Sequence, residues 1–334
     1  RFANRGLVRS GRYYIPALIS IDAGERRFAF LDEPYPTGGG GTIVFARQHP
    51  DLPTAWTNEE ATKVSWTNAT TRIRLLSDHM PWAQAIVQFV GFIDTHPDDD
   101  RDTLTARLLH EGARFFRVPF SRTILDRATY PDILTKDEGR VLNTSIGRNL
   151  RLVPIYCTVA TPNKYSSDNY WRVFTIAAHD IARLISVGTE TQQGQGPIRS
   201  AKLGATTDNA TFEWDANPDE GPYYVAIDGY GTPPDDANNQ LMNLPYGTQA
   251  NALTAPRTVL ETFLKVFLGV AASALGASFS ATDARVQVFR RFSQPYSDPG
   301  SILNAIQAHL TETMTFLYFK PATETWEWED VVKA

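Results

Sequence analysis

The chain has 334 residues, of which 42% are hydrophobic and 21% charged, and its formal net charge is −5 at pH 7. These values exclude a disordered chain, and the negative net charge excludes a protein that coats nucleic acid over its whole surface. Cys157 is the only cysteine, which excludes an intrachain disulfide and a cysteine-rich metal site.

The first twelve residues form a basic segment that contains Arg1, Arg5, Arg9 and Arg12 and no acidic residue. We expect a basic N-terminal arm over residues 1–12 that binds phosphate groups of nucleic acid through charge. A solvated or partner-bound tail would have the same composition. The chain begins with arginine and not methionine, so we also expect a processed N-terminus or a fragment.

The region 13–188 reads as a mixture of strands and helices. Strands are predicted where β-branched and aromatic residues cluster or alternate, at 13–21, 26–31, 42–47, 71–76 and 150–160. Helices are predicted where apolar residues recur three and four positions apart, at 82–93, 103–117 and 170–187. The acidic run 94–102 would then lie at a helix N-terminus, where negative charge is favoured.

Residues 189–251 read as long polar loops around a short strand at 223–228, and we expect a domain boundary or an exposed excursion there. The last region, 252–334, is expected to complete the same core as residues 13–188. Its predicted elements after the first helix are a helix at 302–310 and strands at 284–289, 315–319 and 326–332.

The most distinctive stretch is 254–276, which predicts one long apolar helix. Thr254 is a favourable N-cap, Pro256 fits the first turn, and Gly276 can end the helix. The charged residues between Thr254 and Gly276 are spaced four apart and form one polar stripe: Arg257, Glu261 and Lys265. Because small residues dilute its second half, we expect a buried helix and no membrane span. The predicted fold is α+β, with this central helix packed against a mainly antiparallel sheet that strands from both ends of the chain join.

Motifs for metal or cofactor chemistry are absent from the sequence. The six histidines form no His-x-x-x-His pair, and neither a Gly-x-Gly-x-x-Gly nor a Gly-x-Ser-x-Gly motif occurs. Cys157 lies within an apolar stretch, where a thiol usually packs and does not react. We therefore expect no cofactor and no bound metal.

Glu111 and Arg114 lie three residues apart in the string LLHEGARFFRV, so they would share one face of the predicted helix 103–117. This string resembles the Glu-Ala-Ala-Arg-Phe helix of ribosome-inactivating N-glycosidases. Ile146-Gly147-Arg148 falls where that family has Trp-Gly-Arg, and the predicted helix from Tyr170 falls where it has another helix. The resemblance implies an RNA N-glycosidase in which Glu111 activates water and Arg114 stabilises an oxocarbenium-like sugar. The structural alternative is an exposed salt bridge on a helix.

Features typical of assembly recur along the chain. Of its 32 lysines and arginines only seven are lysine, and it holds seven Trp and 13 Tyr, as interface cores do. Our leading hypothesis is a non-enzymatic, self-assembling structural subunit, most plausibly a viral capsid or capsid-associated protein located in the virion. Its partners would be copies of itself and nucleic acid. The alternatives are the RNA N-glycosidase and a ligand- or carbohydrate-binding module that uses loop aromatics such as Trp56 and Trp214.

Overall fold

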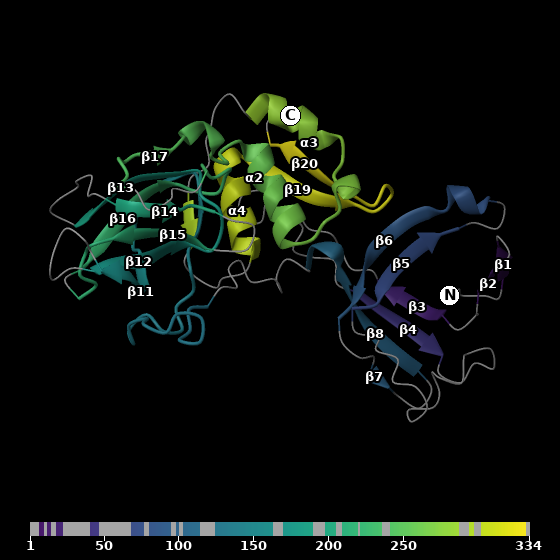
Figure 1. The fold of residues 1–334 in the computed structure, drawn as a ribbon. Helices are drawn as coiled ribbons and strands as arrows, with labels where there is room; N and C mark the ends of the chain where they lie inside the picture. The colour runs from purple at the N-terminus through teal and green to yellow at the C-terminus, as the bar shows by residue number, and fades with distance from the viewer. Residues whose placement is uncertain are drawn as a thin grey trace. The chain divides into compact units, whose positions relative to one another are not determined.

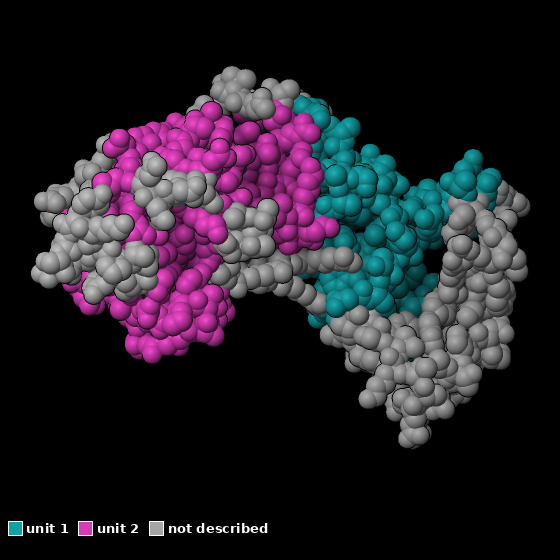
Figure 2. All heavy atoms as spheres, in the orientation of Figure 1, with its two compact units in different colours: residues 1–117, 270–282, 314–334 teal, residues 118–269, 283–313 magenta. Residues whose placement is uncertain are grey.

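A computed structural model gives the fold as two compact units, neither of which is continuous in sequence (Figure 2). The structure describes residues 7–9, 12–14, 18–22, 41–46, 68–76, 80–94, 98–99, 103–113, 124–162, 170–189, 198–204, 209–219, 221–235, 241–286, 294–296 and 302–331. Unit 1 comprises Arg1–Arg117, Val270–Thr282 and Met314–Ala334, and unit 2 comprises Val118–Gly269 and Asp283–Thr313. The four-part division expected from the sequence stays a prediction.

The main sheet of unit 1 is antiparallel, in the order β3-β4-β8-β6-β5, with β7 beside β8 (Figure 1). Its strands are β3 (Leu18–Asp22), β4 (Gly41–Ala46), β5 (Thr70–Leu75), β6 (Ile86–Ile93), β7 (Asp98–Asp99) and β8 (Thr103–His110). Burial alternates along β8, so that Leu104, Ala106 and Leu108 enter a core with Phe45 and Phe89. A shift of one residue in strand pairing would turn these side chains away from the core, so their burial fixes the register of the strands.

Two hairpins complete unit 1. The first pairs β1 (Leu7–Arg9) with β2 (Arg12–Tyr14), and the second pairs β19 (Thr315–Lys320) with β20 (Thr325–Asp330). The buried Trp328 ring of β20 packs against Phe279, and the Thr282 hydroxyl donates to the Trp328 carbonyl at 2.7 Å. The short helical elements of this part include η1 (Trp82–Gln84), η5 (Ala272–Ala274) and the start of α3 (Ser278–Val286).

Unit 2 is a sandwich of two four-stranded antiparallel sheets, in the orders β10-β16-β13-β17 and β11-β12-β15-β14. Its strands are β9 (Thr144–Ile146), β10 (Arg148–Leu152), β11 (Ile155–Pro162), β12 (Tyr170–Ala177), β13 (Arg183–Thr189), β14 (Ile198–Lys202), β15 (Ala210–Trp214), β16 (Tyr223–Asp228), β17 (Tyr246–Gly247) and β18 (Gln294–Tyr296). The strands β9 and β18 form a separate antiparallel pair.

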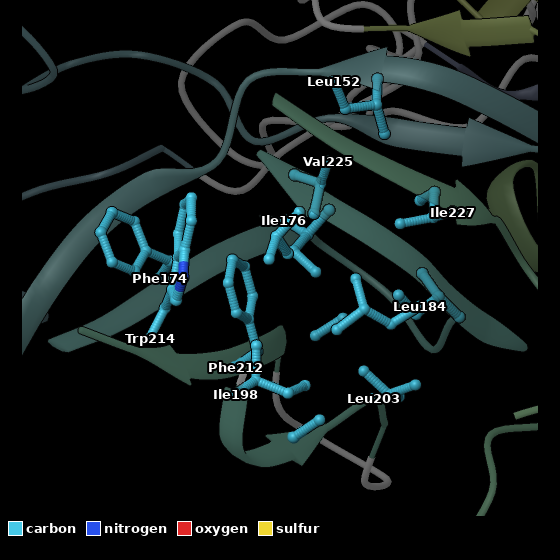
Figure 3. Packing of buried hydrophobic residues seen from close by; sticks show 14 of the residues in the cluster. Leu152, Phe174, Ile176, Leu184, Ile198, Leu203, Phe212, Trp214, Val225 and Ile227 are labelled. Carbon is cyan, nitrogen blue, oxygen red and sulfur yellow. The ribbon is translucent and has the colours of Figure 1, made fainter. Parts of the chain in front are cut away.

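Both sheets of unit 2 contribute to one hydrophobic core (Figure 3). Leu184 and Ile227 come from the first sheet, and Phe174, Ile176 and Phe212 from the second. The Phe174 and Phe212 rings stack with their centroids 5.6 Å apart. Because each sheet buries one face in this way, alternate residues on its strands face outward.

The helices of unit 2 follow the last strands of the sandwich. They are η3 (Gln249–Asn251), α2 (Pro256–Thr262), the π-helical turn η4 (Phe263–Phe267) and α4 (Ile302–Thr313). Phe263 is fully buried and its ring meets the His309 ring of α4 edge-on at 6.1 Å. Burial of the His309 imidazole lowers its pKa to about 3, so this side chain is neutral at physiological pH.

The α+β prediction is wrong, because the described chain is mostly antiparallel sheet with three short α-helices. The helices predicted at 82–93, 103–117 and 170–187 contain the strands β6, β8, and β12 with β13, while the strand predicted at 284–289 overlaps α3. Apolar residues in these segments satisfy the helical spacing and the alternation of a strand alike, and burial against neighbouring strands decided the outcome.

The predicted central helix at 254–276 is also wrong in length. The continuous helix ends with the turn η4, and Gly269 takes a positive φ of 68°, so that only the separate short turn η5 follows before Gly276. Ala255, not Thr254, is the N-cap. The polar stripe is confirmed, since Glu261 accepts from the Arg257 guanidinium at 2.6 Å and also binds Lys265.

Other elements agree with the sequence. The predicted strands at 42–47, 71–76, 223–228, 315–319 and 326–332 correspond to β4, β5, β16, β19 and β20, and the helix at 302–310 to α4. However, β19 pairs with β20 and with no other strand of the described chain, so a common sheet that joins both chain ends is not observed.

The stacked ring of Phe212 is a test of the sandwich core. Phe212→Ala should lower the free energy of unfolding of unit 2 by about 3–5 kcal/mol, because it leaves a cavity between the sheets. Hydrogen exchange of the β12 and β15 amides measures the loss within this unit. Leu241→Ala, at a side chain 57% exposed, should change the same amides by less than about 0.5 kcal/mol. Equal effects of the two substitutions would contradict the shared core.

Candidate interaction surfaces and polar pocket

The edge strand β5 of unit 1 carries an exposed apolar pair. Leu75 lies directly across from Ile86 of β6, and their side chains are 56% and 52% exposed. The strand is held in place by a bidentate contact, since the Arg72 guanidinium donates to both carboxylate oxygens of Glu324 at 2.7 and 2.6 Å. An edge strand presents backbone N–H and C=O groups that can pair with another chain. Among the described residues β5 pairs with no strand other than β6, so this part of β5 combines an edge of the described sheet with apolar surface.

The outer face of the first unit 2 sheet carries an ion cluster. Asp228 of β16 lies across from Arg148 of β10 on one side and Arg183 of β13 on the other. The Arg148 guanidinium donates to both carboxylate oxygens at 2.9 and 3.3 Å, and Arg183 lies 3.7 Å away. The Asp228 side chain is only 1% exposed, so its charge depends on these arginines for compensation.

A shallow groove of about 190 Å³ continues along the same face. The Arg151 guanidinium lies 4.5 Å from the centroid of the Tyr224 ring and donates to its hydroxyl at 3.2 Å. Leu150 lines the groove with 66% of its side chain exposed, and Ile185 is a further apolar contributor. The groove therefore offers a stacked cation and apolar surface together.

A polar pocket of about 780 Å³ lies in unit 2, lined by described residues. Its lining comes from the turn after β12, the segment after β16, and the chain from η3 into α2: Ala178, His179, Asp180, Tyr230, Gly231, Thr232, Ala250, Asn251, Ala252, Leu253, Thr254, Ala255, Thr258 and Thr262. Four threonine hydroxyls, a phenol and an amide belong to this set. A volume of this size is typical of small-molecule sites.

The pocket wall is made by two chain segments that lie very close together. The Leu253 N–H donates to the Tyr230 carbonyl at 2.6 Å, and the Thr232 N–H donates to the Asn251 carbonyl at 3.2 Å. Gly231 stands between these bonds, where a Cβ atom would lie 2.1 Å from the Asn251 carbonyl oxygen. The approach therefore requires glycine at this position.

His179 fixes the base of the pocket through both of its ring nitrogens. Nε2 accepts a hydrogen bond from the Ser145 N–H at 2.8 Å, and Nδ1 lies 2.8 Å from the Asp180 carbonyl, which can only accept. These contacts assign the proton to Nδ1. The Tyr230 ring lies 4.6 Å away, centroid to centroid. Burial lowers the pKa of His179 to about 4, so the imidazole is neutral at physiological pH.

The described side chains of the pocket are better suited to binding a ligand than to transferring a proton. The lone pair of His179 Nε2 is engaged by backbone, so this ring does not serve as a general base. Burial raises the pKa of Tyr230, with a smaller contribution from the negative charge of Asp180, and the phenol stays protonated. Asp180 is the one carboxylate of the described lining.

The structure removes the helical basis of the N-glycosidase resemblance. Glu111 follows the strand β8 in a short 3-10 turn, and Arg114 lies outside the described residues. Ile146 is buried in β9, Arg148 is committed to Asp228, and the expected helix from Tyr170 is the strand β12. Two helices that the resemblance needs are therefore strands.

The other predicted site residues are only partly described. Arg1 and Arg5 lie outside the described residues, whereas Arg9 and Arg12 lie opposite each other in the β1–β2 pair. Trp56 is outside the described residues as well. Trp214 is buried in the sandwich core, which excludes it as an exposed stacking residue of a loop.

Sequence reasoning missed the polar pocket. Thr254, Thr258 and Thr262 are spaced four apart, and this spacing was the visible signal of a hydroxyl-bearing helix face. The hydrogen bond between His179 and Ser145 joins residues 34 positions apart, so no local sequence pattern could predict it.

No group of three or more His, Cys, Asp or Glu side chains positioned to hold a metal ion occurs among the described residues. Within the same residues, no helix has both the length and the apolar character needed to cross a membrane. No family model matches the chain, and no curated protein matches it.

The neutral, partly buried imidazole of His179 predicts a pH dependence of stability. The folded side chain has a pKa of about 4 against an ordinary value of 6.5, so the unfolded state binds more protons between these pH values. The free energy of unfolding should therefore fall as pH decreases from 6.5 to 4, with His179 contributing up to about 3 kcal/mol. Urea unfolding at several pH values measures this slope.

His179→Gln is the comparison, because its amide oxygen can still accept from the Ser145 N–H without titrating. The variant should show a smaller slope, while the contribution of His309 remains in both proteins. Equal slopes in wild type and variant would contradict the assignment of the titration to His179.

Proposed function

We propose that this protein is a structural subunit that assembles with copies of itself into a closed shell around nucleic acid, as a viral capsid or capsid-associated protein does. The observation that carries the proposal is the edge strand β5 with its exposed Leu75 and Ile86 pair. Natural proteins usually protect such an edge with short strands, charge or a covering segment. An apolar pair at this edge of the described sheet is instead suited to a partner.

A second copy of the chain is a suitable partner for this edge. A strand from another subunit can extend the sheet through backbone hydrogen bonds, while its apolar side chains cover Leu75 and Ile86. The Arg72–Glu324 contact keeps β5 in its paired conformation before association, which reduces the ordering cost. The low lysine content and the many aromatic residues of the chain also match interface composition.

Nucleic acid is the second proposed partner, through Arg1, Arg5, Arg9 and Arg12. Arg9 and Arg12 are backbone partners in the β1–β2 pair. The first twelve residues contain these four arginines and no acidic residue, and guanidinium groups form charge-assisted hydrogen bonds with phosphate. The proposed contact is therefore electrostatic and independent of base sequence.

Assembly can be tested at the β5 edge. Leu75→Lys combined with Ile86→Lys should prevent association, because charge at an edge blocks strand pairing and the apolar cover is lost. Light scattering and electron microscopy measure particle size over a range of protein concentrations. Leu241→Lys is the matched control, since its side chain is similarly exposed at 57% but lies in unit 2. A wild-type protein that stays monomeric at high concentration would overturn the proposal.

Nucleic-acid binding can be tested through its salt dependence. Replacing Arg1, Arg5, Arg9 and Arg12 by alanine should reduce the slope of log affinity against log salt by about 3 for single-stranded RNA, as expected for four phosphate contacts. Fluorescence anisotropy with a labelled oligonucleotide measures the slope. The same four positions replaced by lysine should keep the wild-type slope. An unchanged slope in the alanine variant would show that these arginines do not contact the phosphates.

A further inference from the structure

The polar pocket of unit 2 has a ligand chemistry that the assembly role does not use. Its described lining contains no lysine or arginine, and its histidine is neutral. The described lining therefore offers no cationic side chain to compensate the charge of a phosphate or a carboxylate ligand.

Several hydroxyl groups line the pocket. Thr258 and Thr262 of α2 are four residues apart, about 6 Å along the helix, and Thr254 precedes the N-cap Ala255. The Thr262 hydroxyl donates to the Thr258 carbonyl at 2.8 Å, which leaves its oxygen as an acceptor. Asn251 adds an amide with both donors and an acceptor.

Two aromatic rings also belong to the lining. The Tyr230 and His179 rings are 4.6 Å apart and are held there by the hydrogen bonds of His179 to Ser145 and Asp180. Gly231 allows the neighbouring backbone segments to lie in close contact, and hydrogen bonds between them form the wall without a ligand. A neutral ring with several hydroxyl groups and an apolar face would satisfy the hydroxyl groups and the aromatic rings together.

We propose that this pocket binds a neutral saccharide, with Thr258 and Asn251 contacting its hydroxyl groups and Tyr230 lying against its ring. The site is separate from the β5 edge and from the arginines of the N-terminal segment. Saccharide binding therefore does not depend on the proposed assembly, and either can fail without the other. A shell subunit with such a pocket would have a place to hold a surface glycan.

Saturation-transfer difference NMR on the full chain tests the proposal, with the methyl glycosides of mannose, galactose and glucose as separate probes at millimolar concentration. At least one should receive saturation from the protein, and inorganic phosphate at the same concentration should not displace it. Transfer to none of the three glycosides, or displacement by phosphate, would overturn the proposal.

Two variants place the binding in this pocket. Thr258→Val removes one hydroxyl at nearly constant volume and should weaken binding about fivefold, as expected for one lost hydrogen bond. Asn251→Ala, at an exposed side chain, should weaken it similarly without disturbing the fold. Thr311→Val is the matched control, on an exposed position of α4 outside the pocket, and should bind as wild type does. Unchanged binding in both pocket variants would place the saccharide elsewhere and refute the site.

Discussion

Unit 2 depends on burying the inner faces of its two sheets against each other. Phe174, Phe212 and the aliphatic residues around them occupy the space between the sheets, and this burial is the main favourable term in the stability of such a sandwich (Figure 3). Everything placed on the outside follows from the alternation of side chains along the same strands. The Asp228 cluster and the Tyr224 groove lie on one outer face because their neighbours in sequence point inward.

Close backbone packing at the end of the sandwich has a second consequence. Ser145, His179 and Gly229 come from three separate segments, and Gly229 leaves no space for a side chain, because a Cβ atom would lie 2.4 Å from the Ser145 carbonyl oxygen. A partly buried, neutral imidazole is compatible with this region because its two nitrogens satisfy one backbone donor and one backbone acceptor. The histidine thus acts as a fixed connector between chain segments and gives the adjoining pocket a defined base.

Local patterns predicted strands whose residues alternate or cluster by type, such as those of β5, β16 and the β19–β20 hairpin, and the polar stripe of α2. Local patterns were misleading where an apolar segment fits the spacing of both a helix and a strand. In Thr103–His110 the leucines at 104, 108 and 109 fit a helix, but the segment is a strand that pairs with β4 and β6. No local sequence pattern could predict the candidate pocket as a whole. Its histidine, its glycine wall and its threonine row come from separate stretches that only the tertiary fold brings together.

Because the two units are each built from separate segments of the chain, their organisation affects folding during synthesis and the outcome of proteolysis. The polypeptide passes from one unit to the other at residues 117–118, 269–270, 282–283 and 313–314, so each unit needs segments from both halves of the sequence. During synthesis, unit 1 cannot be completed until the β19–β20 hairpin has left the ribosome, although its first strands emerge at the start. A protease nick between the units would leave fragments that are each incomplete, so the final residues govern when the earliest ones become fully folded.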